Sequence, residues 1–359
     1  MAPENKKTPV GILGATGVVG QRFIQLLENH PWFEIAWLAA SDRSEGKLYG
    51  EAVRWRLKTD LPERIAAMRM SPANIAAGAP KVIFAALDAS IAAELEPLFA
   101  EAGCAVVSNS SAFRMQSDVP LVIPEVNPEH LALIDAQSWR KKSGGFIVTN
   151  ANCSAIGLVL ALAPLQKAFG LQTVMATTMQ AISGAGYPGV PSLDILGNVV
   201  PYIPKEEEKM EEETQKILGK LAGSALVPAV VPAAFGMSAH CNRVAVEDGH
   251  TESITVKLGK TARAEEIIEA WNSFRGVAQE LKLPTAPEQP VVYLTAPDRP
   301  QPRIDVDRGR GMTTSVGRLR ACKVLDWKFT VLSHNVIRGA AGAAVLNGEL
   351  LKAKGYLST

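Results

Sequence analysis

Short apolar runs alternate with longer amphipathic stretches in the first 150 residues of the chain. Residues 18–29 repeat apolar side chains at the spacing of one helical face. Continuous apolar runs, which are typical of buried strands, lie at residues 10–13, 34–39 and 81–86, with shorter candidates at 105–108 and 121–123. This alternation predicts right-handed crossovers and a parallel sheet with helices on both faces.

The pattern changes after about residue 151. The segment TESITVKL, at residues 251–258, alternates polar and apolar side chains, which predicts a strand of an antiparallel sheet with one solvated face. We also expect strands at residues 173–181 and 243–246, and helices at 205–218, 262–282 and 337–354. The last helix should pack back on the first half. The prediction is therefore a first domain of residues 1–150, completed by 333–359, and a second domain of residues 151–332.

Charge and composition exclude several classes of function. The 359 residues contain 37 Lys and Arg against 36 Asp and Glu, so a net charge of +1 creates no field that would gather nucleic acid or an anionic membrane. No secretory signal or long apolar span is recognisable, which favours a cytoplasmic location. The four cysteines have neither zinc-ligand spacing nor the density of a disulfide scaffold, so we expect no metal site.

A glycine-rich segment, GILGATGVVG at residues 11–20, follows the first predicted strand and opens the first helix. Glycines at this junction let a backbone approach a pyrophosphate, whose charge is received by the helix N-terminus. The alternative is a tight structural turn. The predicted fold class is thus α/β, with a Rossmann-type doubly wound dinucleotide-binding domain followed by an α+β domain.

The cofactor preference depends on the segment after the second strand. Arg43, flanked by the hydroxyls of Ser41 and Ser44, suits a 2′-phosphate, whereas Asp42 is a contrary signal and a solvated polar loop is the alternative. We interpret this set as favouring NADP over NAD.

Cys153 is the strongest candidate for a nucleophile. It follows a polar loop that contains Asn150 and Asn152 and precedes a long apolar helix, where the helix N-terminus should stabilise a thiolate and lower the thiol pKa. The same N–H groups and the Asn152 side chain could hold an oxyanion. The alternative, a structural cysteine, is our interpretation of Cys104 and Cys322.

Polar candidates follow in the second half. Arg243 and His250 lie seven residues apart, and a hairpin would place a carboxylate clamp beside a proton shuttle. Gln180 ends a strand before a glycine-rich segment at residues 183–189, which by itself is only a loop. Arg114 ends a polar loop that could bind an anion. Glu206 and Lys209 lie three apart on a helix, and their spacing alone favours surface charge.

Taken together, these segments resemble the aspartate-β-semialdehyde dehydrogenases, in the branch found in archaea and fungi. The resemblance covers nearly the whole chain and rests on segments that include GATGVVGQRF, SDRSEGK, SNSSAFRM, NANCSAIGL, TMQAISGAGYPGVPSLDI, EEEKMEEETQKIL, CNRVAVEDGHTE and HNVIRGAAGAAVLNGELL. It implies a homodimer or homotetramer that contains a dinucleotide-binding domain and a catalytic, dimer-forming domain.

The resemblance also implies a role for each matching residue. Cys153 would be the acyl-thioester nucleophile and His250 the general acid/base. Gln180 would orient the substrate beside the thiol, and Asn152 would lie near the reacting carbonyl. The substrate contacts would be Arg243 for the α-carboxylate, Glu206 for the amino group, and Arg114 and Lys209 for the phosphoryl group. The NADP(H) contacts would be Gly14, Thr16, Gly17, Val18 and Val19 at the pyrophosphate, Arg43 and Ser44 at the 2′-phosphate, Ser183 and Gly184 at the nicotinamide, and Asn335.

The implied reaction is the NADPH-dependent reductive dephosphorylation of L-4-aspartyl phosphate to L-aspartate 4-semialdehyde, in lysine, threonine and methionine biosynthesis. Malonyl-CoA reductases share some of these segments, but coenzyme A requires no α-carboxylate clamp. N-Acetyl-glutamyl-phosphate reductases share the glycine loop and the cysteine, but their other characteristic segments are missing. A non-catalytic NADP-binding protein would lack the nucleophile or its partner, and both are present here.

Overall fold

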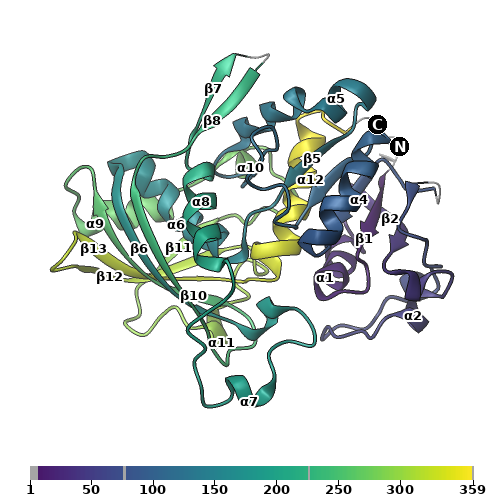
Figure 1. The fold of residues 1–359 in the computed structure, drawn as a ribbon. Helices are drawn as coiled ribbons and strands as arrows, with labels where there is room; N and C mark the ends of the chain where they lie inside the picture. Colours follow the sequence, from purple (N-terminus) through teal and green to yellow (C-terminus); the bar gives the residue numbers. More distant parts are fainter. Residues whose placement is uncertain (1–6, 76–77, 225–226, 358–359) are drawn as a thin grey trace, which may run out of the picture.

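The computed structural model describes residues 7–75, 78–224 and 227–357, which form two large sheets and a two-stranded hairpin, with helices packed around the large sheets (Figure 1). One sheet is parallel and is built from the first half of the chain, and the other is mixed and is built from the second half. This arrangement confirms the predicted α/β fold class.

The strands of the parallel sheet lie in the order β2-β1-β3-β4-β5. Their bounds are β1 (Thr8–Leu13), β2 (Phe33–Ala39), β3 (Val82–Ala85), β4 (Ala105–Ser108) and β5 (Phe146–Thr149). The first four match the predicted runs. The strand predicted at residues 121–123 is wrong, because Leu121 makes only an isolated bridge to Thr149 of β5, and β5 itself was not predicted.

Helices cover both faces of this sheet. Alternate strand residues belong to separate cores, so that Phe84 packs with α1 (Val18–Leu27) and α12 (Gly342–Ala353), while Ile83 packs with α4 (Ala89–Glu101) and α5 (Ser138–Ser143). The predicted helix at residues 337–354 does not begin as an α-helix, because its first turn is the π-helix η5 (Ile337–Ala341). As Figure 1 shows, α12 lies beside the N-terminal half of the chain.

The mixed sheet contains six strands within the described residues, in the order β11-β12-β13-β10-β6-β9. They are β6 (Leu171–Gln180), β9 (Gly236–Arg243), β10 (His250–Leu258), β11 (Val291–Leu294), β12 (Thr314–Ala321) and β13 (Trp327–Ser333). As predicted, β10 is antiparallel to its neighbours. The strand predicted at residues 243–246 is misplaced, because β9 ends at Arg243.

One face of the mixed sheet is covered by α6 (Cys153–Phe169), α8 (Glu206–Ile217) and α9 (Ala264–Asn272). The helix predicted over residues 262–282 is interrupted between α9 and α10 (Val277–Glu280). Gly276 lies there against the Glu125 backbone, so closely that a Cβ atom would be 2.3 Å from the Glu125 oxygen. The opposite face of the sheet is open, with Met175 half exposed.

Short elements connect these layers. They are η1 (Asp42–Ser44), α2 (Tyr49–Ala52), α3 (Glu63–Ala66), η3 (Pro128–Ala136), η4 (Ile182–Ala185), α7 (Ser192–Ile195), α11 (Pro302–Asp305) and the projecting hairpin of β7 (Lys220–Ser224) and β8 (Val227–Val231) (Figure 1). Across the described ranges, no helix has the length and apolar character needed to cross a membrane. The predicted domain boundaries stay a prediction, since Ala278 and Leu283 pack in the core beside the parallel sheet.

Candidate active site

A cavity of about 460 Å³ lies where the carboxyl ends of β1, β3, β4 and β5 meet. Its lining includes residues that follow each of these strands, among them Val18, Leu87, Asn109 and Cys153. Ligands of open α/β sheets bind at this edge. A larger cavity of about 670 Å³ lies at the amino ends of the strands, but neither a cysteine nor a histidine is among its described lining residues.

The glycine-rich segment forms a tight strand-to-helix turn. Gly14 has a φ of +86°, and a Cβ atom there would lie 2.4 Å from the Ala86 oxygen. A Cβ on Gly20 would lie 2.3 Å from the Gly14 oxygen, so the helix packs closely on the turn. Val18 and Val19 then line the cavity at the start of α1, after Thr16 and an N-cap at Gly17 that has no side-chain capping bond. The N-terminus of α1 therefore faces the cavity without a capping side chain.

The remaining predicted cofactor residues fall into two groups. Ser183, Gly184 and Asn335 line the cavity, and the Asn335 side chain donates a hydrogen bond to Ser183 Oγ at 2.8 Å. The second group, Ser41 to Ser44, follows β2 and does not line the cavity. Within it, Ser41 and Arg43 are exposed and Ser44 is buried.

Cys153 is the first residue of α6. Asn152 is the N-cap, and its side-chain oxygen accepts the N–H groups of Ser154 and Ala155 at 2.9 and 3.1 Å. The sulfur of Cys153 lies 3.3 Å from His250 Nε2. Because His250 Nδ1 accepts the N–H of Ala181 at 3.0 Å, the neutral ring carries its proton on Nε2 and directs it at the sulfur.

The thiol in this free site is not ionised at neutral pH. Burial raises the pKa of Cys153 to about 12, helped by the negative charge of Glu206 and opposed by Arg114 and Arg243. Burial and the positive charge of Arg243 lower the pKa of His250 to about 3. The predicted lowering of the thiol pKa is therefore wrong for the free protein, because burial and the carboxylates of α8 outweigh the two arginines.

Gln180 and Arg243 lie opposite each other at the ends of β6 and β9, and both line the cavity. The hairpin predicted between Arg243 and His250 is wrong, because β6 lies between β9 and β10. The two residues still meet beneath the loop after β6. A Cβ on Gly184 would lie 2.9 Å from Arg243 Nη1 and 3.1 Å from His250 Cε1.

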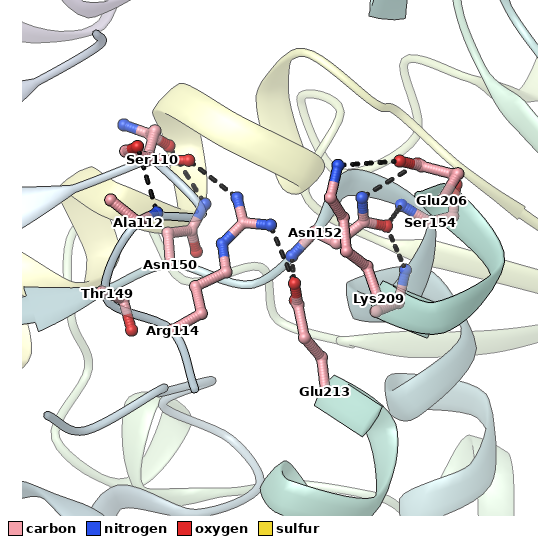
Figure 2. Close-up of polar contacts among 12 residues, drawn as sticks. Ser110, Ala112, Arg114, Thr149, Asn150, Asn152, Ser154, Glu206, Lys209 and Glu213 are labelled. Atoms are coloured by element: carbon pink, nitrogen blue, oxygen red, sulfur yellow. Dashed lines mark hydrogen bonds and ion pairs between the residues drawn. The ribbon is translucent and has the colours of Figure 1, made fainter. Parts of the chain in front are cut away.

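Charged residues converge at the other end of the cavity (Figure 2). Arg114 is buried, and its Nη2 donates to the Asn109 carbonyl at 2.7 Å. Glu206 is also buried and accepts the Asn152 side chain at 2.9 Å, while Lys209 Nζ lies 3.6 Å from Glu206. The surface-charge interpretation is thus wrong for Glu206.

Two residues at the site were missed by the sequence analysis. Glu213 is buried on α8 and contacts both Arg114 and Asn152. Gly339 of η5 lies against Cys153, so that a Cβ atom would be 2.8 Å from Cys153 Cβ. Glu213 had a signal, since it continues the helical spacing of Glu206 and Lys209. Within the described residues, no group of three His, Cys, Asp or Glu side chains could hold a metal ion.

Comparisons with known proteins agree with this geometry. Residues 9–134 match the family described as semialdehyde dehydrogenase, NAD binding domain, and residues 162–338 match semialdehyde dehydrogenase, dimerisation domain. An aspartate-semialdehyde dehydrogenase of Archaeoglobus fulgidus is 51% identical over 95% of this chain and 97% of its own length. That of Saccharomyces cerevisiae is 46% identical over 98% of this chain and 99% of its own length.

Solved structures give the same result. The crystal structure of aspartate-semialdehyde dehydrogenase with NADP from Candida albicans superposes with a TM-score of 0.89. It has 44% sequence identity and covers 98% of this chain and 100% of its own.

Proposed function

This chain belongs to the family of aspartate-semialdehyde dehydrogenases, and from that premise we propose that it reduces L-4-aspartyl phosphate to L-aspartate 4-semialdehyde with NADPH and releases phosphate. The reaction serves lysine, threonine and methionine biosynthesis. The observation that carries the proposal is the 3.3 Å contact between Cys153 Sγ and His250 Nε2 at the N-terminus of α6. Cys153 lines the same cavity as the start of α1 and the cations Arg114 and Arg243.

The first step joins Cys153 to the substrate. The sulfur attacks the acyl carbon, the carbon–oxygen bond to phosphate breaks, and the thiol proton leaves with the product as hydrogen phosphate, which balances the step. Cys153 begins the reaction as a thiol and therefore carries the proton that the departing phosphate takes up. We assign the oxyanion contact to the backbone N–H of Cys153, because those of Ser154 and Ala155 donate to the Asn152 side chain, whose amide nitrogen donates to Glu206.

Charged side chains of the cavity orient the substrate. Arg243 offers a planar cation to the α-carboxylate, and Glu206 offers a carboxylate to the amino group. Arg114 and Lys209 are the cations for the phosphoryl group. Gln180 lies beside Arg243, and we assign to it the role of holding the acyl group against the sulfur.

The turn before α1 suits the pyrophosphate of a dinucleotide. The N-terminus of α1 has no side-chain cap, and the cavity continues from Val18 and Val19 to Cys153 without interruption. NADPH, when bound, supplies the hydride that reduces the thioester. We assign its contacts to Gly14, Thr16, Gly17, Val18, Val19, Ser41, Arg43, Ser44, Ser183, Gly184 and Asn335.

His250 completes the reaction. Its Nε2 proton points at the sulfur, so we assign to it the transfer of that proton to Cys153 as the aldehyde leaves. A proton from solvent then replaces it on Nε2 and restores the neutral ring.

The test is to measure NADP reduction with aspartate semialdehyde and phosphate beside NADPH oxidation with malonyl-CoA. We expect turnover only in the first assay and its loss in Cys153→Ala, which should keep NADP binding. A preference for malonyl-CoA would overturn the proposal.

The open face of the mixed sheet supports a proposal about assembly. Half-exposed Met175 and the exposed Thr177, Ser253 and His240 lie on it, opposite the helices, in the region matched by the dimerisation domain. We propose that two copies pair through this face, as a homodimer or as half of a homotetramer. Light scattering of Met175→Arg should then show monomers, and an unchanged mass would refute this interface.

Two further predictions belong with this proposal. Residues 1–150 with 333–359 form the NADP-binding domain and residues 151–332 the catalytic domain. The protein acts in the cytoplasm, which fractionation of the source cells would check.

A further inference from the structure

Four charged residues of α8 repeat along one face of the helix. Glu206, Lys209, Glu213 and Lys216 lie three, four and three positions apart, which places them in one row. Three of them are buried, with Glu213 only 1% exposed. A buried charge is costly unless it is paired, so the contacts of this row indicate what it holds in place.

Glu213 connects two parts of the site (Figure 2). Its Oε1 accepts a hydrogen bond from Arg114 Nη1 at 2.9 Å, and its Oε2 accepts the backbone N–H of Asn152 at 2.6 Å. Arg114 lies on the loop after β4, and Asn152 is the N-cap of the helix that begins with Cys153. One buried carboxylate therefore joins a cation of the site to the start of the nucleophile helix.

Lys216 binds the backbone of the same loop. Its Nζ donates to the carbonyl oxygens of Arg114, Gln116 and Val119 at 2.6, 2.8 and 3.1 Å. The backbone of the loop is thus fixed by Lys216, and the guanidinium of Arg114 is oriented by Glu213.

We propose that Glu213 is a positioning residue, which sets the guanidinium of Arg114 at a fixed place relative to Cys153 so that Arg114 can receive the phosphoryl group. This inference rests on the proposed function. Both carboxylate oxygens are needed, because each accepts a different donor. In Glu213→Gln the amide nitrogen must face either Arg114 or the Asn152 N–H, and both are donors. Glu213→Asp keeps the charge but is one methylene too short to span the two.

The experiment compares both variants with the full-length wild-type protein in the phosphate-consuming direction. Losing one charged hydrogen bond should raise the KM for inorganic phosphate about tenfold in each variant. The KM for aspartate semialdehyde should stay within about twofold, since Glu213 contacts neither Arg243 nor His250. Glu212→Gln, which removes an exposed charge from the same helix, is the matched control and should leave both values unchanged.

Two outcomes would overturn the proposal. A lower KM for phosphate in Glu213→Gln would mean that the carboxylate only repels the anion. An unchanged KM with a lower melting temperature would mean that Glu213 only stabilises the fold. Calorimetry of inorganic phosphate binding to the NADP-loaded protein tests the role of Glu213 without turnover. A wild-type protein that does not turn over aspartate semialdehyde would refute the proposed function, and the calorimetry would still test Glu213.

Discussion

Gly339→Ala is the substitution that most directly tests how tightly the nucleophile is held. The added Cβ would lie 2.8 Å from Cys153 Cβ and 2.9 Å from Cys153 Cα. Ordinary carbon contacts are about 3.5–4.0 Å, so one segment must move by about 1 Å. Neither moves easily, because α6 is buried along most of its length and η5 is anchored by a buried Arg338–Glu125 ion pair with contacts of 2.9 and 2.7 Å.

The expected magnitudes follow from this crowding. Overpacking of this kind costs about 1–3 kcal/mol of folding stability. A nucleophile displaced by about 1 Å can cost about 100-fold in rate. We therefore expect kcat for phosphate-dependent NADP reduction to fall about 100-fold, with a folded protein that still binds NADP.

The control for this prediction is Gly236→Ala on β9, whose added Cβ would have only the Gln172 oxygen within reach, at 3.8 Å. It should keep full activity. If Gly339→Ala also kept wild-type kcat, the close contact between η5 and Cys153 would have no catalytic meaning.

Three further predictions concern charge and pH. Arg243→Lys should raise the KM for aspartate semialdehyde at least about tenfold, because an ammonium group cannot replace the bidentate contact of a guanidinium with the α-carboxylate. An unchanged KM would exclude this role of Arg243. Because the pKa of Cys153 is raised to about 12, its alkylation by iodoacetamide in the free protein should still accelerate between pH 7 and 9, and a plateau near pH 7 would contradict this. Burial raises the pKa of Glu96 from 4.5 to about 7, so its contribution to stability is lost as pH rises through that window. In Glu96→Gln, the fall in the free energy of unfolding between pH 4.5 and pH 8 should be about 3 kcal/mol smaller than in the wild type, as measured by urea unfolding.

Local patterns predicted the parts of the site that depend on neighbouring residues. The glycine turn before α1 and the position of Cys153 at the start of α6 could both be read from the sequence, because a polar segment next to an apolar run marks a strand or helix end. The strand β5 could not be predicted, since its four residues lie within a longer uncharged stretch that has no clear strand boundary.

Long-range pairing and burial could not be predicted in the same way. The strand β6 separates Arg243 from His250, and that order depends on segments far apart in the chain. The thiol pKa of Cys153 depends on burial and on charges from α8, from the loop after β4 and from β9, which no local pattern contains. The roles of Glu213 and Lys216 likewise became visible only when α8 was seen to pack on the Arg114 loop.

The covalent bond between Cys153 and the acyl group is the central claim, and mass spectrometry tests it most directly. The wild-type protein should be mixed with aspartate semialdehyde and NADP without phosphate, so that oxidation proceeds to the thioester and stops. The account predicts one aspartyl group on the peptide that contains Cys153, no adduct in Cys153→Ala, and loss of the adduct when phosphate is added. An unmodified Cys153 in a sample that reduces NADP once phosphate is present would contradict it.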